Sequence, residues 1–225
     1  MKKVLAISLA VIMLVCFAAC GGNGAKVEPY EGQLTDLVAA MYEKQPVEFM
    51  VGPAMEIDLS DAWAVKSYLG LGSGEAEEIP AADENTPAPA SEDAPAAEDN
   101  APAAMPEEEA AAPAADFGIK EAVFSESMIG AQAYSLVVAR VSDTDKIEEI
   151  KKAMFEGIDT RKWICVEADQ LRVVSCKDII VLVMSSTQLA EGLADGMVKA
   201  FAESITGAAV EDVATVLTGE ILKKG

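Results

Sequence analysis

The chain has 225 residues, a formal net charge of −21 and no histidine. This length allows one or two domains. The acidic balance argues against nucleic acid as a partner, because phosphates require basic patches, and against attraction to anionic lipid head groups. The absence of histidine excludes Ser-His-Asp and Cys-His catalysis, whereas hydrolysis by a carboxylate pair stays open. The sequence contains no zinc-ligand spacing, glycine-rich phosphate loop or nucleophile elbow, and it predicts neither a metal nor a cofactor.

The N-terminus has the pattern of a bacterial lipoprotein signal. Residues 1–19 start with Lys2 and Lys3 and continue as an uncharged apolar run that is too short for a comfortable transmembrane helix. The run leads into FAAC at residues 17–20, which resembles the lipobox of bacterial lipoproteins with Phe in place of the more usual Leu. We expect residues 1–19 to be a cleaved signal peptide and Cys20 to carry the lipid, which anchors the protein to the cell membrane outside the cytoplasm. An apolar helix or a cleaved signal without lipid is the alternative.

Two segments have the composition of spacers. Residues 20–33 are predicted to be the tether, because their glycine-rich start suits a loose connection. Residues 75–116 contain thirteen Asp or Glu, no Lys or Arg, sixteen Ala and seven Pro. Such a segment cannot bury enough apolar surface to offset the entropy of ordering it. We predict a disordered acidic Ala/Pro-rich insertion without a function of its own; a spacer or partner-binding arm is the alternative.

Residues 34–74 are too few for an independent core without a metal or disulfides. They either pack against the downstream part, with 75–116 looping out, or form a short helical arm. Packing is favoured because long surface insertions add little closure entropy. Helical spacing predicts a first helix, ended by Pro46, with the apolar residues Leu34, Leu37, Val38 and Met41.

The rest of this portion is predicted to hold a short strand and a second helix. The strand spans residues 47–51. Asp58 or Ser60 caps the helix and Gly70 ends it. Its apolar residues are Trp63, Val65 and Leu69.

Residues 117–206 are predicted to form an α+β domain. The strand at 134–141 is apolar on both faces, which predicts a central position in a sheet. Ser142 or Asp143 caps the helix that follows, Gly157 ends it, and Glu148 and Lys152 form an ion pair on its surface. Its apolar stripe consists of Ile147, Ile150, Met154 and Phe155.

Two or three strands and a long helix come next. Residues 163–167 and 171–174 are predicted as strand, and a turn at 176–178 leads into a buried strand at 179–184. Residues 185–188 resemble a capping box. The helix after them has apolar residues at four-residue steps, namely Leu189, Leu193, Met197, Phe201 and Ile205.

The order strand-helix-strand-strand-helix indicates an α+β fold, with helices packed on one face of a mainly antiparallel sheet. Residues 207–225 are predicted to be a weak C-terminal helix, broken at Gly219, or a tail.

Several stretches of the chain resemble a known family. A short helix follows the lipobox, then Tyr68-Leu69-Gly70, then a strand from Tyr134 with Arg140 near its end, and residues 157–166 (GIDTRKWICV) form a recurring block. This layout resembles small clostridial lipoproteins that are classified as a domain of unknown function, the family numbered four-three-five-eight. The resemblance covers 34–74 and 117–186, although the turn at 176–178 departs from the Gly-Asp turn expected there. It implies a lipoprotein address and a fold, but neither an activity nor site residues.

Charged residues on either side of the strand predicted at 163–167 are candidate ligand or partner contacts. Arg161 and Lys162 could hold an anionic group such as a phosphate or a teichoic acid, because Arg makes bidentate contacts and Lys supplies a point charge. The alternative is a solvated turn in which Trp163 anchors the core. Glu167 and Asp169 form a carboxylate pair that suits acid-base work or calcium, or that is only a solvated turn.

A polar loop and two cysteines complete the candidates. Ser127 and Gln132 lie in the polar segment 125–133, and loops on a rigid scaffold often carry function. Cys165 and Cys176 are predicted to be buried thiols rather than a disulfide, and a redox role is remote without a C-x-x-C motif.

The recognisable patterns downstream of Cys20 are structural. We therefore predict an extracytoplasmic lipoprotein that is not an enzyme but a binding or interaction module, whose partner is an envelope protein or a small ligand. One alternative is an envelope hydrolase that uses two carboxylates across a pocket. Its candidate carboxylates are Glu121, Glu126, Glu167 and Asp169. The other alternative is an accessory subunit of a larger envelope complex, which a large exposed apolar patch would favour.

Overall fold

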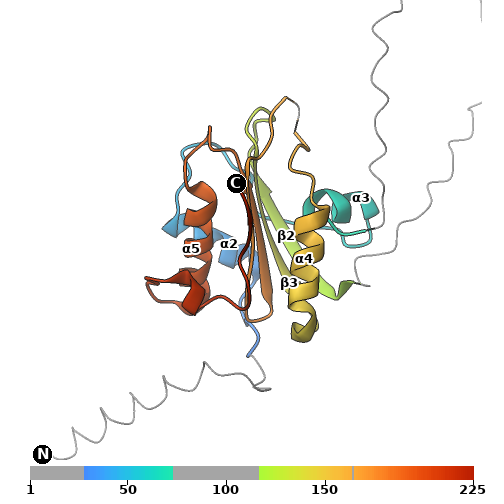
Figure 1. Ribbon diagram of the computed structural model, residues 1–225, viewed down its shortest axis with the longest axis vertical. Coiled ribbons are helices and arrows are strands. Elements are labelled where there is room, and N and C mark those ends of the chain that lie inside the picture. Colours follow the sequence, from blue (N-terminus) through green and yellow to red (C-terminus); the bar gives the residue numbers. More distant parts are fainter. Residues whose placement is uncertain (1–27, 73–116, 164) are drawn as a thin grey trace, which may run out of the picture.

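The computed structural model of the chain describes residues 28–72, 117–163 and 165–225 (Figure 1). The predicted signal peptide, the lipidation site Cys20 and the acidic insertion at 75–116 lie outside the described residues. Within the described part, no helix has the length and apolar character that a membrane crossing requires.

A six-stranded antiparallel sheet forms the centre, with the strand order β1-β2-β3-β5-β4-β6. The strands are β1 (Met55–Glu56), β2 (Ile119–Glu126), β3 (Tyr134–Val141), β4 (Gln170–Cys176), β5 (Ile179–Ser185) and β6 (Leu222–Lys224). The central position predicted for 134–141 is confirmed, because β3 pairs with β2 on one side and with β5 on the other.

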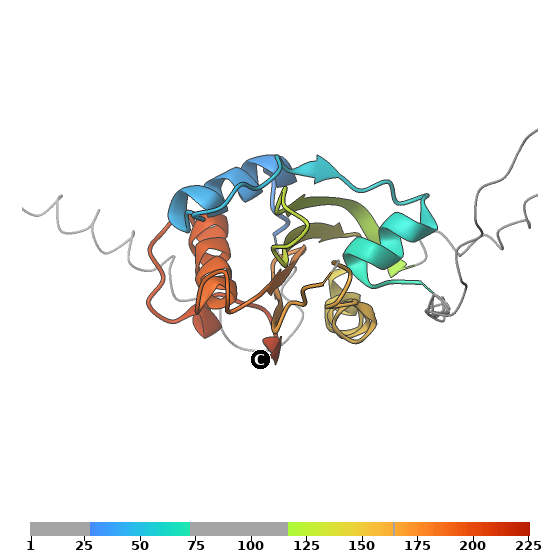
Figure 2. The ribbon, with the colours of Figure 1, turned by 90° about the horizontal axis from the view of Figure 1, so that it is seen from above.

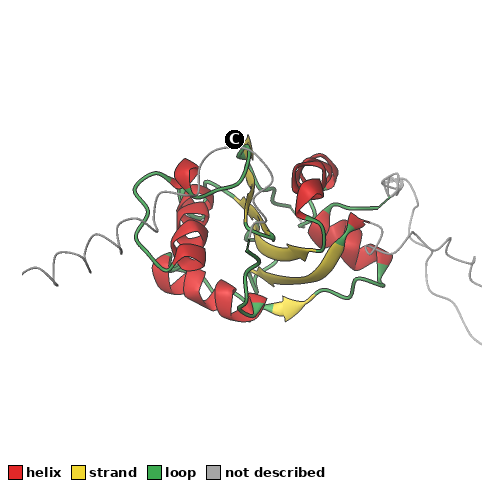
Figure 3. Cartoon of the chain, turned by 90° about the horizontal axis from the view of Figure 1, so that it is seen from below, coloured by secondary structure: helices red, strands yellow, loops and turns green. Residues whose placement is uncertain are grey.

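Helices cover both faces of this sheet (Figures 2 and 3). Helices α2 (Leu34–Lys44) and α5 (Leu193–Thr206) pack on one face; α4 (Ile147–Gly157), α3 (Ala62–Ala64) and the π-helical turn η1 (Val65–Leu69) pack on the other. Along β3, Leu136 and Val138 belong to the core between the sheet and α2 and α5. Val137 and Ala139 belong to the core between the sheet and α4 and η1. The predicted α+β class is confirmed. The prediction that the helices pack on one face of the sheet is wrong, because both faces of the central strands are apolar and each must be covered.

The N-terminal portion contributes to both the sheet and a helical layer. Strand β1 pairs with β2, and α2 packs against α5. Of the two arrangements open from the sequence, the structure has the one in which residues 34–72 pack onto the downstream part. The predicted apolar stripe of α2 is buried as expected.

The second predicted helix, formed by α3 and η1, differs from its prediction in the residue that caps it and in which of its apolar residues are buried. The Asp61 carboxylate accepts hydrogen bonds from the backbone N–H groups of Trp63 (2.9 Å) and Ala64 (3.3 Å), while Asp58 is bonded to Ser60. The helix ends at Gly70 as predicted, and Gly70 has a left-handed conformation (φ 68°). Of the three predicted apolar residues, Val65 and Leu69 in η1 are buried, but Trp63 in α3 is 66% exposed.

Two strand predictions are wrong, and strands β1, β2 and β6 were not predicted. Residues 47–51 contribute only a single bridge, from Val51 to Ser127. Trp163 and residues 165–167 are not in a strand, and β4 begins at Gln170. Strand β2 was not expected, because exposed Lys120 and Glu121 interrupt its apolar pattern.

The C-terminal part also differs from its prediction. Helix α5 begins at Leu193 instead of Leu189, after Gly192 in the left-handed region (φ 74°), and Ser186 caps only a turn by accepting from the Gln188 N–H. Residues 207–225 hold a short 3-10 turn, η4 (Val213–Thr215), and the edge strand β6.

A chain of hydroxyl groups runs through the α2 face of the core. The Tyr134 hydroxyl donates to Tyr42 Oη (3.2 Å), Tyr42 Oη bonds to Ser125 Oγ (2.8 Å), and Ser125 donates to the Gly52 carbonyl (2.7 Å). Burial raises the pKa of Tyr134 well above its ordinary 10.0 and also raises the pKa of Tyr42. The pKa values of the other two tyrosines, Tyr30 and Tyr68, are raised for the same reason.

We predict that the protein unfolds at alkaline pH. Above pH ~10 the unfolded chain releases phenolic protons that the folded protein retains, so the free energy of unfolding decreases as the pH rises further. Phenolate absorbance and circular dichroism, followed together in an alkaline titration, should change in a single transition above pH ~10. Tyr134→Phe should make stability fall less steeply in this range. Tyrosines that ionise near their ordinary pKa while the fold stays intact would contradict the prediction.

The two ends of the sheet have different roles. At one end, here called the tether end, the first described residues meet Arg140 of β3 and Asp178, which precedes β5. The opposite end, the loop end, carries the turn at 127–133 between β2 and β3 and the loop at 158–169 before β4 (Figure 1).

Candidate functional site

The loop at 158–169 carries four of the six predicted contact residues. The Asp159 carboxylate accepts from the Arg161 backbone N–H (2.8 Å), and the Ala168 N–H donates to the Thr160 carbonyl (2.8 Å), which closes the base of the loop. Cys165 has a left-handed backbone (φ 64°), which lies outside the extended region of a regular strand. This local geometry explains why the apolar residues around Trp163 do not form the predicted strand.

Lys162 is held inside the protein and is not free for a ligand. Its ammonium forms an ion pair with Glu126 of β2 and lies 3.3 Å from the Ser67 carbonyl oxygen. The same ammonium lies 4.7 Å from the ring centre of Tyr68 and 5.3 Å from that of Trp163, within cation–π range. Burial lowers the pKa of Lys162, and the Glu126 carboxylate partly counteracts this effect.

The aromatic rings that contact this ammonium belong to a larger cluster of rings from three segments. The Tyr68 ring stacks on Phe124 of β2, with centroids 3.9 Å apart, and receives Trp63 edge-on at 6.0 Å. Lys162 links Tyr68 to Trp163. We call Trp63, Tyr68, Lys162 and Trp163 the aromatic row.

The row leads to a cavity at the loop end. The cavity has a volume of about 420 Å³, is open to solvent, and has Trp163 in its lining. The other lining residues are Arg161, Cys165, Val166 and Glu167. The predicted contacts Arg161 and Glu167 are therefore brought together, with an indole beside them.

The charges of the row and cavity balance. Lys162 is paired with Glu126, and the cavity holds one cation, Arg161, and one carboxylate, Glu167. The predicted cationic pair for an anionic group is not formed, because Lys162 is neutralised inside the protein. The arrangement offers a donor and an acceptor to a ligand without a net positive field.

The remaining predicted contacts serve the fold of the loop end. Asp169 accepts from the backbone N–H of Thr187 (2.7 Å) and from its hydroxyl, and this hydroxyl lowers the pKa of Asp169. Ser127 donates to the Gln132 side-chain oxygen (2.8 Å) across the turn at 127–133. Asp169, Ser127 and Gln132 thus hold loops in place and do not line the cavity.

The carboxylates proposed for a hydrolase are not gathered at the cavity. Glu121 is paired with Arg140, Glu126 with Lys162, and Asp169 with Thr187, which leaves Glu167 as the one carboxylate in the cavity lining. No group of three or more His, Cys, Asp or Glu side chains is placed to hold a metal in the described ranges.

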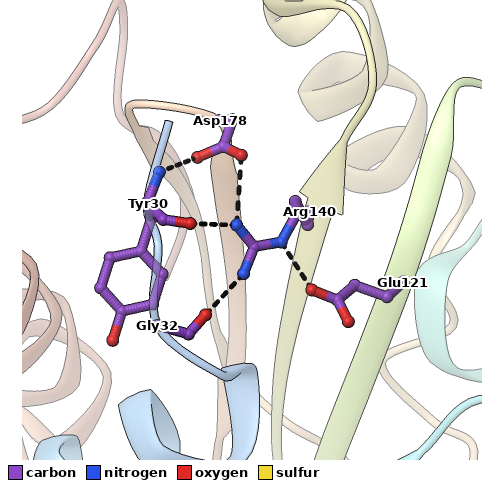
Figure 4. Close-up of polar contacts among 5 residues, drawn as sticks. All are labelled: Tyr30, Gly32, Glu121, Arg140 and Asp178. Carbon is purple, nitrogen blue, oxygen red and sulfur yellow. Dashed lines mark hydrogen bonds and ion pairs between the residues drawn. The ribbon is translucent and has the colours of Figure 1, made fainter. Parts of the chain in front are cut away.

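Arg140 binds the start of the folded chain to the sheet (Figure 4). Its guanidinium donates to the backbone carbonyls of Tyr30 and Gly32 (2.7 Å for Gly32) and pairs with Glu121 and Asp178. Asp178 in turn accepts from the Tyr30 N–H (2.7 Å). Because this cluster is filled by backbone groups, its role is to fix the point at which the chain enters the fold.

The two cysteines downstream of Cys20 are both free thiols, as predicted, but only one is buried. Cys176 ends β4, and burial raises the pKa of its thiol. Cys165 is exposed because the loop around it is not a strand.

Sequence reasoning did not predict how the aromatic row is assembled and supported. Trp63 was predicted as an apolar residue of its helix, and Phe124 and Glu126 lie in a strand that was not expected. No spacing in the sequence indicates that Trp63 and Tyr68 meet, because Trp63 lies in α3 and Tyr68 in the π-helical turn η1. No family model, curated protein or solved structure matches this chain.

Proposed function

We propose that this protein is a lipid-anchored extracytoplasmic binding module, and that its ligand binds to the aromatic row and the adjoining cavity. The observation that carries the proposal is the convergence of Trp63, Tyr68 and Trp163 beside a cavity that holds Arg161 and Glu167. Small-molecule sites combine aromatic walls with a few polar groups in this way.

The orientation that the anchor would give the fold relative to the membrane supports the proposal. With Cys20 as the anchor, residues 21–28 can span at most roughly 30 Å, so the tether end stays near the membrane. The Arg140 cluster fixes the chain there. The cavity belongs to the loop end and would then face away from the membrane, where envelope components are accessible.

The ion pairs of Glu121 and Glu126 support binding rather than catalysis. The carboxylates of Glu121 and Glu126 face fixed cations. A general acid or base needs a titratable group that is free to exchange a proton with its substrate. In the cavity lining, Glu167 is the one carboxylate that meets this requirement.

The anchor is tested by Cys20→Ser in the full chain, expressed in a bacterium with a labelled fatty acid. We expect the wild-type protein to incorporate the label and sediment with membranes, whereas the variant is unlabelled and absent from the mature membrane fraction. Cys16→Ser is the matched control, since Cys16 lies within the predicted signal and should leave labelling unchanged. A label that survives Cys20→Ser would refute the anchor.

The binding module is tested with the mature chain carrying Cys20→Ser, incubated with isolated cell-envelope material and sedimented. Saturable co-sedimentation that Trp163→Ala reduces would support binding at the aromatic row and cavity. Co-sedimentation unaffected by this variant would place binding elsewhere. Release of soluble fragments from the material, abolished by Glu167→Gln, would favour the hydrolase instead.

A further inference from the structure

Both tryptophans of the chain lie in the aromatic row. Trp63 is 66% exposed, and Trp163 lines the cavity. An indole buries more apolar area than most side chains, so leaving one in solvent forgoes a large stabilisation. Tryptophan is also among the residues that most often dominate the energy of a binding site. The two indoles are therefore the expected anchors for a ligand.

The aromatic surface is held rigidly. Tyr68 stands between Phe124, stacked at 3.9 Å, and the Lys162 ammonium at 4.7 Å from its centre, and it supports Trp63 edge-on. The Lys162 ammonium is fixed in turn by Glu126 and the Ser67 carbonyl. Rings that are already held lose little conformational freedom when a ligand packs on them.

The charges select against an anionic ligand. Lys162 is neutralised by Glu126, and Arg161 shares the cavity with Glu167, so no uncompensated cation remains in the row or the cavity lining. The chain as a whole carries −21, which repels polyanions at long range. A phosphate-bearing polymer would meet this field and the Glu167 carboxylate, whereas a neutral polar ligand would not.

We propose that this surface binds a neutral saccharide chain, with sugar rings packed on Trp63 and Trp163 and hydroxyls bonded to Arg161 and Glu167. This inference rests on the proposed binding function and names its ligand. The C–H face of a sugar ring is apolar and suits an aromatic surface, while each hydroxyl both donates and accepts, which matches a guanidinium beside a carboxylate. The cavity of about 420 Å³ is open to solvent, so a chain can continue from it along the row.

Tryptophan fluorescence tests the inference directly, because both indoles of the protein belong to the row. The mature chain with Cys20→Ser is titrated with neutral tetrasaccharides built from glucose, mannose or N-acetylglucosamine, and in parallel with a glycerol-phosphate tetramer. We expect a saturable change in emission with at least one neutral tetrasaccharide and none with the phosphate tetramer. Trp63→Ala should weaken this binding by about tenfold.

Met128→Ala is the matched control for Trp63→Ala, because Met128 is equally exposed (67%) and lies in the turn at 127–133, outside the row. It should leave the affinity unchanged. Thermal melting of both variants checks that each is folded; an exposed side chain should be removable without loss of the fold.

Two results would overturn the inference and leave the proposed function standing. The first is that envelope material still co-sediments in a Trp163-dependent manner while none of the neutral tetrasaccharides changes the fluorescence. The second is saturable binding of the phosphate tetramer with an affinity equal to or higher than that of the sugars. Failure of both co-sedimentation and fluorescence would overturn the proposed function together with the inference.

Discussion

Replacing Lys151 by methionine should destabilise the protein by about 3 kcal/mol, although methionine nearly preserves the side-chain volume. Lys151 of α4 is fully buried, and its three ammonium hydrogens are used by the Glu148 carboxylate (3.0 Å) and by the carbonyl oxygens of Thr218 (3.3 Å) and Glu220 (2.6 Å). Lys151→Met leaves the Glu220 carbonyl without its side-chain donor and the Thr218 carbonyl with only the Ser175 hydroxyl (2.9 Å). The free energy of unfolding in urea measures the loss.

The same variant should loosen one part of the sheet more than the rest. Strand β6 begins two residues after Glu220 and pairs with β4 along three residues. Hydrogen exchange at Leu222–Lys224 should therefore accelerate more than exchange in β5.

Lys152→Met supplies the control for this prediction. Lys152 is the next residue on the same helix, but its side chain is 70% exposed and its pair with Glu156 is long, at 3.8 Å. The control should change stability by less than about 0.5 kcal/mol. Equal losses in the two variants would mean that the contacts of Lys151 with the C-terminal segment contribute nothing.

Lys151 also shows why the surface of α4 was mispredicted. The four-residue spacing predicted an ion pair between Glu148 and Lys152, but Glu148 binds Lys151, and Lys152 faces Glu156. The spacing rule assumes that a helix face is free. Here the C-terminal segment crosses α4 and draws Lys151 inward, which no local pattern can indicate.

The central elements could be predicted because their patterns are local and strong. Strands β3 and β5 are apolar on both faces, and α2 has an unbroken helical stripe. Strand β2 escaped prediction because exposed Lys120 and Glu121 interrupt its apolar pattern, and because its partner β1 lies on the far side of the acidic insertion in the sequence. The loop at 158–169 escaped because its backbone at Cys165 depends on hydrogen bonds around the loop and not on hydrophobicity.

Of the candidate site, only the charged residues of the cavity could be predicted from the sequence. Arg161 and Glu167 are near neighbours in sequence, so one loop brings them to one cavity. The aromatic half joins η1, β2 and the loop through contacts such as that of Tyr68 with Phe124, which are 56 positions apart. Sequence spacing carries no information on such contacts when the strand that supplies Phe124 has not been recognised.

Replacing Gly157 by alanine should also destabilise the protein by about 3 kcal/mol. Gly157 is the last residue of α4 and does not have a positive φ, so alanine suits its backbone and would by itself favour the helix by roughly 1 kcal/mol. A Cβ here, however, would overlap the carbonyl oxygen of Gly70 and lie 3.1 Å from its carbonyl carbon. Both are backbone atoms of the segment that positions Tyr68, so they cannot rotate away.

Gly196→Ala separates this steric effect from the effect of helix propensity. Gly196 lies inside α5, also without a positive φ, and its Cβ would meet the Gln45 side-chain oxygen at 2.5 Å. Because Gln45 can rotate, this variant should be neutral or stabilising by up to about 1 kcal/mol. Thermal and urea unfolding of both variants make the comparison. If Gly157→Ala were as stable as Gly196→Ala, the backbones of α4 and the η1 segment would not be in close contact, and the position of Tyr68 in the aromatic row would lose its support.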